Sequence, residues 1–136
     1  MNNAKKNLDV QGIIKNSTLK VIPGRFAIVK TSGFDNSIKV FLVSLDDTET
    51  TMIVEERQLS KINYIDVQKW FRLIRMEVSV PFFSVGFLAT VTSAIAKKGI
   101  NVLVESTFSY DYLLIRENDF QEAYKALQDL GFRGQI

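Results

Sequence analysis

The alternation of apolar and polar positions is clearest in the carboxyl-terminal half of the chain, where its period changes along the sequence. Residues 76–80 alternate apolar and polar, which is typical of a strand with one buried face. Over residues 87–98 apolar positions recur every three or four residues, which predicts an amphipathic helix that ends at Gly99. Residues 100–104 and 112–115 are apolar runs that predict two further strands.

A second helix is predicted over residues 119–130, because apolar residues again recur at helical spacing and Gly131 follows. Asp119 and Glu122 have the spacing of a capping box at its start. The order strand–helix–strand–strand–helix, with room for a brief last strand, predicts an α+β fold of the ferredoxin-like (βαββαβ) type.

The first half is predicted to be rich in strands. Residues 19–31 read as one bent strand, or two short ones, around Pro23–Gly24. Residues 40–43 are apolar enough to suggest a strand buried on both faces, and residues 51–54 its return partner. The polar residues 46–49 between them predict a solvated hairpin tip.

The chain therefore divides into three predicted parts. Residues 1–18 are polar and are expected to form a flexible or loosely docked N-terminal arm. Residues 19–68 form the β-rich half, which ends in a connecting turn or short helix at 63–69, and residues 69–136 form the ferredoxin-like domain.

Composition narrows the function. The chain has 136 residues, of which 46% are hydrophobic, so it can bury a core in one domain or two small halves. It has no histidine and no cysteine, which removes the usual general base, the commonest metal ligands and any disulfide. We therefore expect a protein that is not an enzyme, with no catalytic residues, no metal and no cofactor.

Charge and hydropathy give the expected surroundings. The net charge of +2 is slight and by itself neither demands nor excludes nucleic acid, because phosphate binding usually shows as a clustered basic face; we expect no nucleic-acid partner. No apolar run is long enough to cross a bilayer and no secretory segment opens the chain, so we expect a cytoplasmic location and no membrane partner.

Two loops of the second half are expected to meet at one end of its sheet. One precedes the first helix, whose amino end offers unpaired N–H groups suited to a carboxylate, and Gly86 leaves that backbone open to close approach. The other lies between strands two and three and carries Asp111, which suits an ammonium. A carboxylate receiver beside an ammonium receiver is what a free α-amino acid requires. The predicted ligand-binding residues are Ser84, Val85, Gly86, Phe87, Thr107, Phe108 and Asp111.

Several short segments carry a resemblance to a known family. The segments 85–89 (VGFLA) and 99–102 (GINV) resemble the first turn, helix and second strand of ACT domains, small regulatory domains of amino-acid metabolism. The segment 106–112 (STFSYDY) resembles the Ser-Thr-Phe/Tyr-x-x-Asp signature of the CASTOR-type ACT subfamily, and 23–27 (PGRFA) and 70–72 (WFR) resemble its other landmarks.

The resemblance, over residues 19–133, implies an ACT domain preceded by a degenerate ACT-like half. It also implies that Gly86 and Asp111 occupy positions at which relatives contact an amino acid, and that the protein is regulatory. The sequence departs from the family pattern at two places: the bulky Phe82-Phe83 before the glycine, and Ser109-Tyr110 before the aspartate. These differences leave the identity of the ligand open.

Simpler interpretations stay open. Gly86 could serve only to start a helix, and Asp111 only to form a turn. An interaction or oligomerisation scaffold without a ligand is the alternative function. RNA binding lacks the Lys/Arg-Gly-Phe pattern, and acylphosphatase chemistry lacks an arginine in residues 81–87.

Affinity arithmetic predicts a partner. A micromolar ligand needs roughly 8 kcal/mol, whereas a charge-assisted hydrogen bond contributes about 1.5–3 and a helix end about 0.3–2. One exposed loop therefore stays near the millimolar range, and tighter binding requires enclosure by the first half or by a second copy. We expect a homodimer, and a partner enzyme or regulator.

Overall fold

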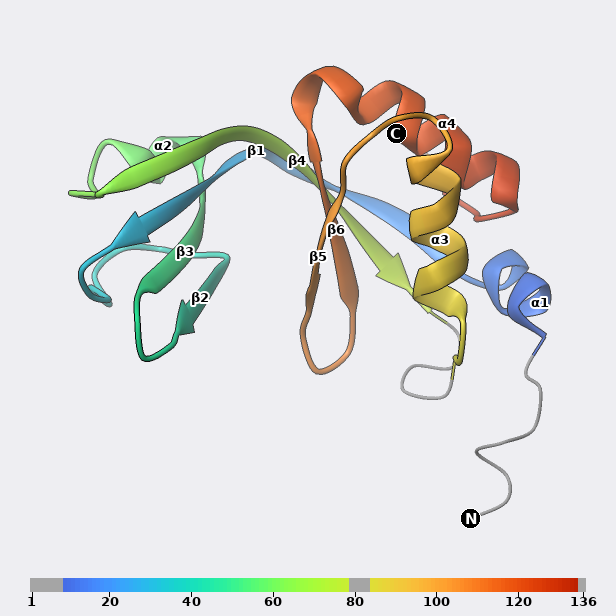
Figure 1. Ribbon diagram of the computed structural model, residues 1–136, viewed down its shortest axis with the longest axis horizontal. Coiled ribbons are helices and arrows are strands. Elements are labelled where there is room, and N and C mark those ends of the chain that lie inside the picture. The colour runs from blue at the N-terminus through green and yellow to red at the C-terminus, as the bar shows by residue number, and fades with distance from the viewer. Residues whose placement is uncertain (1–8, 79–83, 135–136) are drawn as a thin grey trace, which may run out of the picture. The chain divides into compact units, whose positions relative to one another are not determined.

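The computed structural model describes residues 9–78 and 84–134 (Figure 1). Three groups of residues lie outside the described part: residues 81–83 of the loop predicted before the first helix, the last two residues of the predicted strand 76–80, and the first eight residues of the predicted arm. Contacts divide the chain into two compact units. We call Met1–Ile22 with Leu73–Ile136 the helical unit, and Pro23–Arg72 the strand unit.

The helical unit contains the ferredoxin-like arrangement. Its elements in chain order are α1 (Val10–Lys15), the start of β1 (Thr18–Thr31), the end of β4 (Asp66–Glu77), α3 (Phe87–Ala96), β5 (Leu103–Ser106), β6 (Asp111–Arg116), the 3₁₀ turn η2 (Glu117–Asp119) and α4 (Phe120–Leu130). The strand order in this unit is β1-β4-β6-β5. The predicted α+β, ferredoxin-like fold is confirmed.

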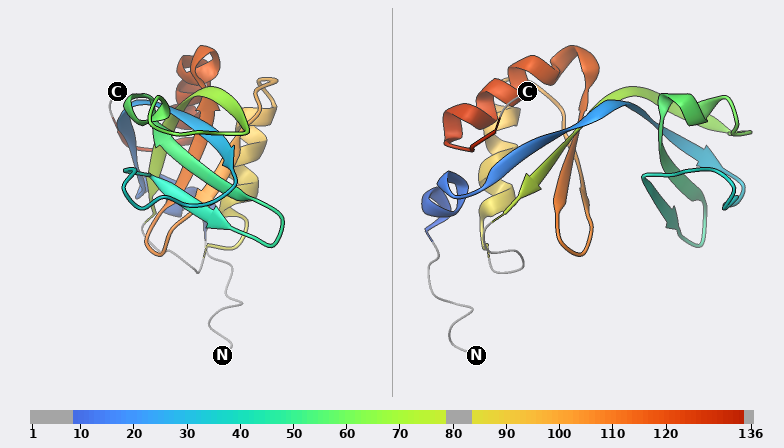
Figure 2. Two further views of the ribbon diagram at one scale, coloured as in Figure 1. Left: turned by 90° about the vertical axis from the view of Figure 1, so that its left-hand side faces the viewer. Right: turned by 180° about the vertical axis from the view of Figure 1, so that it is seen from behind.

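The helices pack against one another and against one face of these strands. Helices α3 and α4 lie side by side, and α1 contacts both (Figures 1 and 2). Their apolar faces and the inward residues of the strands form one core cluster. Its buried members are Ile13, Ile14, Leu19, Ile74, Met76, Phe87, Val91, Ile95, Ile100, Leu113, Ile115, Phe120, Ala123, Tyr124, Leu127 and Phe132.

The end of the chain does not supply the brief last strand that the sequence pattern left room for. The start of β1 occupies the sheet position beside β4 instead. Arg133 makes only an isolated parallel bridge with Thr18. The Leu19 N–H donates to the Arg133 carbonyl at 2.7 Å, and the Arg133 N–H donates to the Ser17 carbonyl at 3.1 Å.

The N-terminal segment differs from the arm expected over residues 1–18. Its described part forms α1, whose start is capped by Asp9, since the Gln11 N–H donates to the Asp9 carboxylate at 3.1 Å. Ile13 and Ile14 are buried in the core of the helical unit. Burial of these two apolar side chains against that core stabilises the docked position of α1.

Three local predictions were wrong in detail. The strand expected over 100–104 forms at Leu103–Ser106, because Ile100 enters the core outside the sheet. The connecting turn or short helix predicted at 63–69 instead contains the start of β4, at Asp66. Asp119 makes no capping bond, because the turn η2 precedes α4 and leaves Asp119 in a helical conformation.

The strand unit has the strand order β2-β3-β1-β4 and one short helix. Its other elements are β2 (Leu42–Leu45), β3 (Thr50–Glu55) and α2 (Glu56–Leu59). Its core is smaller, with the buried residues Ala27, Val29, Ile38, Met52, Val54 and Leu59. The prediction of a strand buried on both faces at 40–43 is wrong: β2 is an edge strand, and its last two residues are exposed.

Candidate functional site

The amino end of α3 is formed by a glycine in a left-handed conformation. Gly86 has φ +83°, a region that side-chain-bearing residues rarely adopt. The Phe87 N–H donates to the Ser84 carbonyl at 3.1 Å, and the Gly86 carbonyl accepts from the N–H and hydroxyl of Thr90. No side chain caps this helix among the described residues. Apart from that of Phe87, the first-turn N–H groups of α3 therefore lack a side-chain cap within the described part of the chain.

The residue nearest to an added side chain at Gly86 is Val10, in the N-terminal helix α1. A side-chain carbon added at Gly86 would lie 3.8 Å from Cγ2 of Val10, an ordinary contact distance. The glycine is therefore required by its backbone angle rather than by crowding.

The second side of the site is the β5–β6 hairpin. Ser106 and Asp111 are its last paired residues, and residues 107–110 form the loop. The Thr107 N–H donates to the Tyr110 carbonyl at 2.8 Å. The Thr107 hydroxyl also accepts from the Tyr110 N–H at 3.3 Å and lies 3.2 Å from its carbonyl oxygen. A hydroxyl side chain thus closes the turn.

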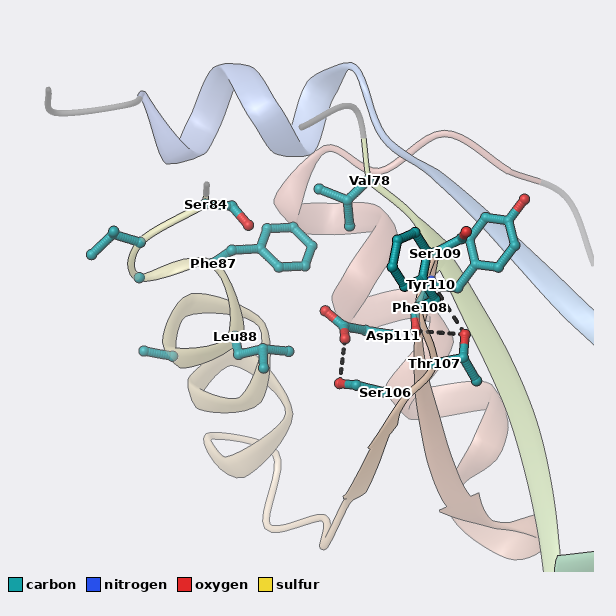
Figure 3. A pocket seen from close by; sticks show the side chains of 13 residues that line it. Val78, Ser84, Phe87, Leu88, Ser106, Thr107, Phe108, Ser109, Tyr110 and Asp111 are labelled. Atoms are coloured by element: carbon teal, nitrogen blue, oxygen red, sulfur yellow. Dashed lines mark hydrogen bonds between the residues drawn. The ribbon is translucent and has the colours of Figure 1, made fainter. Parts of the chain in front are cut away.

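Asp111 is left with one recorded partner, the Ser106 hydroxyl, which donates to Oδ1 at 2.5 Å. No salt bridge involving Asp111 occurs among the described residues. In Figure 3 its carboxylate points from the hairpin toward the side of the pocket formed by α3. Its second oxygen remains available to a donor.

A pocket of about 470 Å³ lies between the start of α3 and this hairpin. Its volume is within the ~300–1,000 Å³ typical of small-molecule sites. The lining residues are Val78, Ser84, Val85, Gly86, Phe87, Leu88, Ala89, Ser106, Thr107, Phe108, Ser109, Tyr110 and Asp111.

All seven residues predicted from the sequence line this one pocket. The sequence-based set of binding residues did not include the other six lining residues, which are Val78, Leu88, Ala89, Ser106, Ser109 and Tyr110. Ser106 could have been found from the hairpin register, since it is the cross-strand partner of Asp111. Leu88 carried no distinguishing signal, because it follows the helical apolar period like a core residue.

The mouth of the pocket is apolar. Val85, Leu88 and Phe108 are exposed by 78%, 38% and 86%. Large apolar side chains at such exposure, gathered around one hollow, are typical of a surface that a ligand or a partner covers.

Arg75, a cation that contacts the hairpin loop, is held by residues other than Asp111. The Arg75 guanidinium lies 4.3 Å from the centre of the Tyr110 ring, and its Nε donates to Glu77 at 2.8 Å. Burial would lower the pKa of Arg75, but hydrogen bonds with Tyr112 and Glu77 outweigh it and raise that pKa above its ordinary value. Arg75 is therefore a charged residue that holds Tyr110 in place.

The described residues contain no cluster of three or more acidic, histidine or cysteine side chains placed to hold a metal. None of the helices in the described part is both long and apolar enough to cross a bilayer.

Comparison with solved structures identifies the fold. A Vibrio cholerae protein of unknown function, described as a possible transport protein, superposes with a TM-score of 0.80 at 17% identity, over 90% of this chain and 95% of that one. A protein from Agrobacterium tumefaciens gives 0.68 at 23% identity, over 88% and 92%. The regulatory subunit of aspartate kinase from Thermus flavus gives 0.55 at 12% identity, over 84% and 95%.

Among curated protein sequences, none matches this chain significantly. The family model of the ACT domain matches residues 67–129. That segment contains all of α3, β5 and β6 and nearly all of β4 and α4, and it includes every lining residue of the pocket. Residues 67–129 are therefore similar to an ACT domain, and the fold resembles that of aspartate kinase regulatory domains.

Proposed function

We propose that the chain is a non-catalytic regulatory module that binds a free amino acid in the pocket between α3 and the β5–β6 hairpin. The carboxylate of the ligand would accept hydrogen bonds from the first-turn N–H groups of α3, beside Gly86. Its ammonium would donate to Asp111. Ser84, Val85, Phe87, Thr107 and Phe108 would complete the binding residues.

The proposal rests on one observation: a helix end suited to a carboxylate and a carboxylate suited to an ammonium line the same pocket. The uncapped helix end carries partial positive charge, and Asp111 carries a negative charge whose recorded partner is only a hydroxyl. A zwitterion fits this pair better than an anion or a cation alone. The aspartate kinase neighbour, a regulatory subunit by its description, supports a regulatory role.

We further propose that the protein acts as a cytoplasmic homodimer. The pocket is open at a mouth of exposed apolar side chains, so one chain alone is expected to bind an amino acid only near the millimolar range. A second copy that covered this mouth would strengthen binding by removing water. A partner enzyme or regulator would receive the signal.

The strand unit is consistent with the degenerate ACT-like half of the CASTOR-type subfamily. It has the strands of such a half without a long helix, since α2 has only four residues. The assignment to that subfamily, the division at residues 19–68 and 69–136, and the tandem arrangement are proposals.

A second function is favoured by the exposure of Val85, Leu88 and Phe108. An ACT-type scaffold without a ligand would use this apolar surface to pair subunits. Its self-association would weaken on Phe108→Ser and stay unchanged on Asp111→Ala.

Calorimetric titration of the full chain with each common amino acid tests the proposal. We expect heat with at least one of them, and loss of that heat in Asp111→Ala. No heat with any amino acid at millimolar concentrations would overturn the sensor and leave the scaffold.

A further inference from the structure

The described lining of the pocket contains one charged side chain, that of Asp111, and no lysine or arginine. The sequence of residues 79–83, SVPFF, also has no charged residue. The described lining can therefore neutralise one positive group with a side chain, whereas for a negative group it offers backbone N–H groups and hydroxyls but no cation.

The α-ammonium and α-carboxylate of any free amino acid would occupy Asp111 and the helix N–H groups, respectively. The described lining then has no second charged group to neutralise a charged ligand side chain. The nearest recorded guanidinium, that of Arg75, stacks on Tyr110 and is paired with Glu77. Moving it into the pocket would break both contacts.

Beside its hydroxyl-bearing residues, the lining offers apolar side chains at the mouth of the pocket. Val85, Leu88 and Phe108 expose most or a large part of their side chains at the mouth. Burial of such surface against an apolar ligand side chain removes it from water on both partners. The volume of about 470 Å³ leaves room for a large side chain beside the zwitterion.

We propose that this pocket selects neutral amino acids with large branched-aliphatic or aromatic side chains, and rejects acidic and basic ones. The inference rests on the proposed function and names its ligand class. An acidic side chain would be desolvated beside Asp111 without a cation. A basic side chain would compete with the α-ammonium for Asp111 and leave one of the two ammonium-type charges unpaired.

Competition calorimetry on the full chain tests this selectivity, with leucine, isoleucine, phenylalanine, alanine, aspartate, glutamate and lysine as the probes. We expect leucine, isoleucine or phenylalanine to bind at least about 10-fold more tightly than alanine, as loss of several buried methylenes implies. Aspartate, glutamate and lysine should bind at least about 10-fold more weakly than the best of these.

A charge placed in the lining should change the selectivity. Leu88→Arg adds a guanidinium at a partly exposed position of α3 and is expected to lower the preference for leucine over glutamate by at least about 10-fold. Leu45→Arg adds the same charge at an exposed position of the strand unit and should leave that preference unchanged. Circular dichroism confirms that both variants are folded.

The outcomes separate the two proposals. Absence of binding by every amino acid overturns the proposed function and this inference with it. Tight binding of aspartate, glutamate or lysine by the unaltered chain overturns the selectivity alone and keeps the sensor. Equal responses of Leu88→Arg and Leu45→Arg also overturn the selectivity.

Discussion

The two units each contain a hairpin with a four-residue loop, and the loops use their acidic residues in opposite ways. In the strand unit Leu45 pairs with Thr50, and in the helical unit Ser106 pairs with Asp111. In the first loop Asp46 accepts from the N–H groups of Thr48 and Glu49, at 2.8 Å each, and from the Thr48 hydroxyl.

In the second loop the hydroxyl of Thr107 closes the turn, and the carboxylate stands one position beyond the loop. Asp111 is therefore not used up by its own backbone. The residue in the matching place of the strand unit is Thr50, which is buried. Asp46 closes its own turn and so has a structural role. In the other hairpin the Thr107 hydroxyl closes the turn, which leaves the Asp111 carboxylate available to a ligand.

The segments that follow β4 and β1 differ as well. In the helical unit β4 leads to α3 through Gly86. In the strand unit β1 leads into turns, in which Thr31 donates to the Gly33 carbonyl and Asp35 accepts from the Ser37 N–H. Among the described residues, only the helical unit thus presents the amino end of a long helix, which supports the binding role proposed for that unit.

The largest expected effect concerns the cores. Ile14→Ala, which empties a fully buried position of the helical core, should lower the free energy of unfolding by about 2–5 kcal/mol. Ile38→Ala, in the smaller cluster of the strand unit, should cost about 2 kcal/mol or less. Chemical denaturation measures both. A larger loss for Ile38→Ala would reverse the ranking of the two units and restore the expected loose N-terminal arm.

The next effect concerns the glycines. Gly86→Ala should lower the free energy of unfolding by about 1–3 kcal/mol, because alanine is strained at φ +83°. Gly33→Ala, in open space and without a positive φ, should change it by less than about 0.5 kcal/mol. Thermal melts compare the two. Equal stability of both variants would mean that the start of α3 does not depend on its glycine.

A smaller gain in stability is expected from Tyr124→Phe in the helical core. The Tyr124 hydroxyl is buried, with the residue 1% exposed, and has no hydrogen-bond partner among the described residues. Its removal should stabilise the chain by about 1 kcal/mol.

The same substitution should change the pH dependence. Burial raises the pKa of Tyr124, so its neutral form is favoured in the folded state. The folded chain should lose stability as pH rises above about 10, where the unfolded tyrosine ionises. Tyr124→Phe should reduce that alkaline slope in denaturation curves recorded between pH 8 and 11. An unchanged slope would show that the hydroxyl finds a partner in solution.

The smallest effect is expected from Asp46→Asn. Hydrogen bonds from the backbone N–H groups of Glu49 and Thr48 lower the pKa of Asp46. Its contribution to stability is therefore present above about pH 4 and lost as pH falls through the lowered folded value. Asp46→Asn should flatten this acid dependence of the melting temperature and leave amino-acid binding unchanged. A loss of binding would place the functional carboxylate in the other hairpin.

Much of this comparison was accessible from the sequence. The helical period predicted α3 and α4. Gly131 is the C-cap of α4 as predicted, whereas α3 ends at Ala96, three residues before Gly99, although both glycines adopt positive φ. The hairpin tip at 46–49 was predicted from its polar residues. These features depend on local backbone preferences.

What the sequence did not reveal depends on tertiary packing. The docking of α1 required the core of the helical unit, which two isoleucines alone do not announce. Strand β5 was predicted too early, so the pairing of Ser106 with Asp111 was missed, and with it the partner of the candidate binding carboxylate. Register follows from the whole sheet, whereas period follows from one segment.

Amide chemical-shift mapping by NMR, with leucine titrated into the isotope-labelled full chain, tests the central claim most directly. The proposed site predicts progressive shifts at Gly86–Ala89 and at residues 106–111, and none at the matching hairpin residues 45–50. Shifts confined to residues 45–50, or no shifts at millimolar leucine while another amino acid moves a different region, would contradict it.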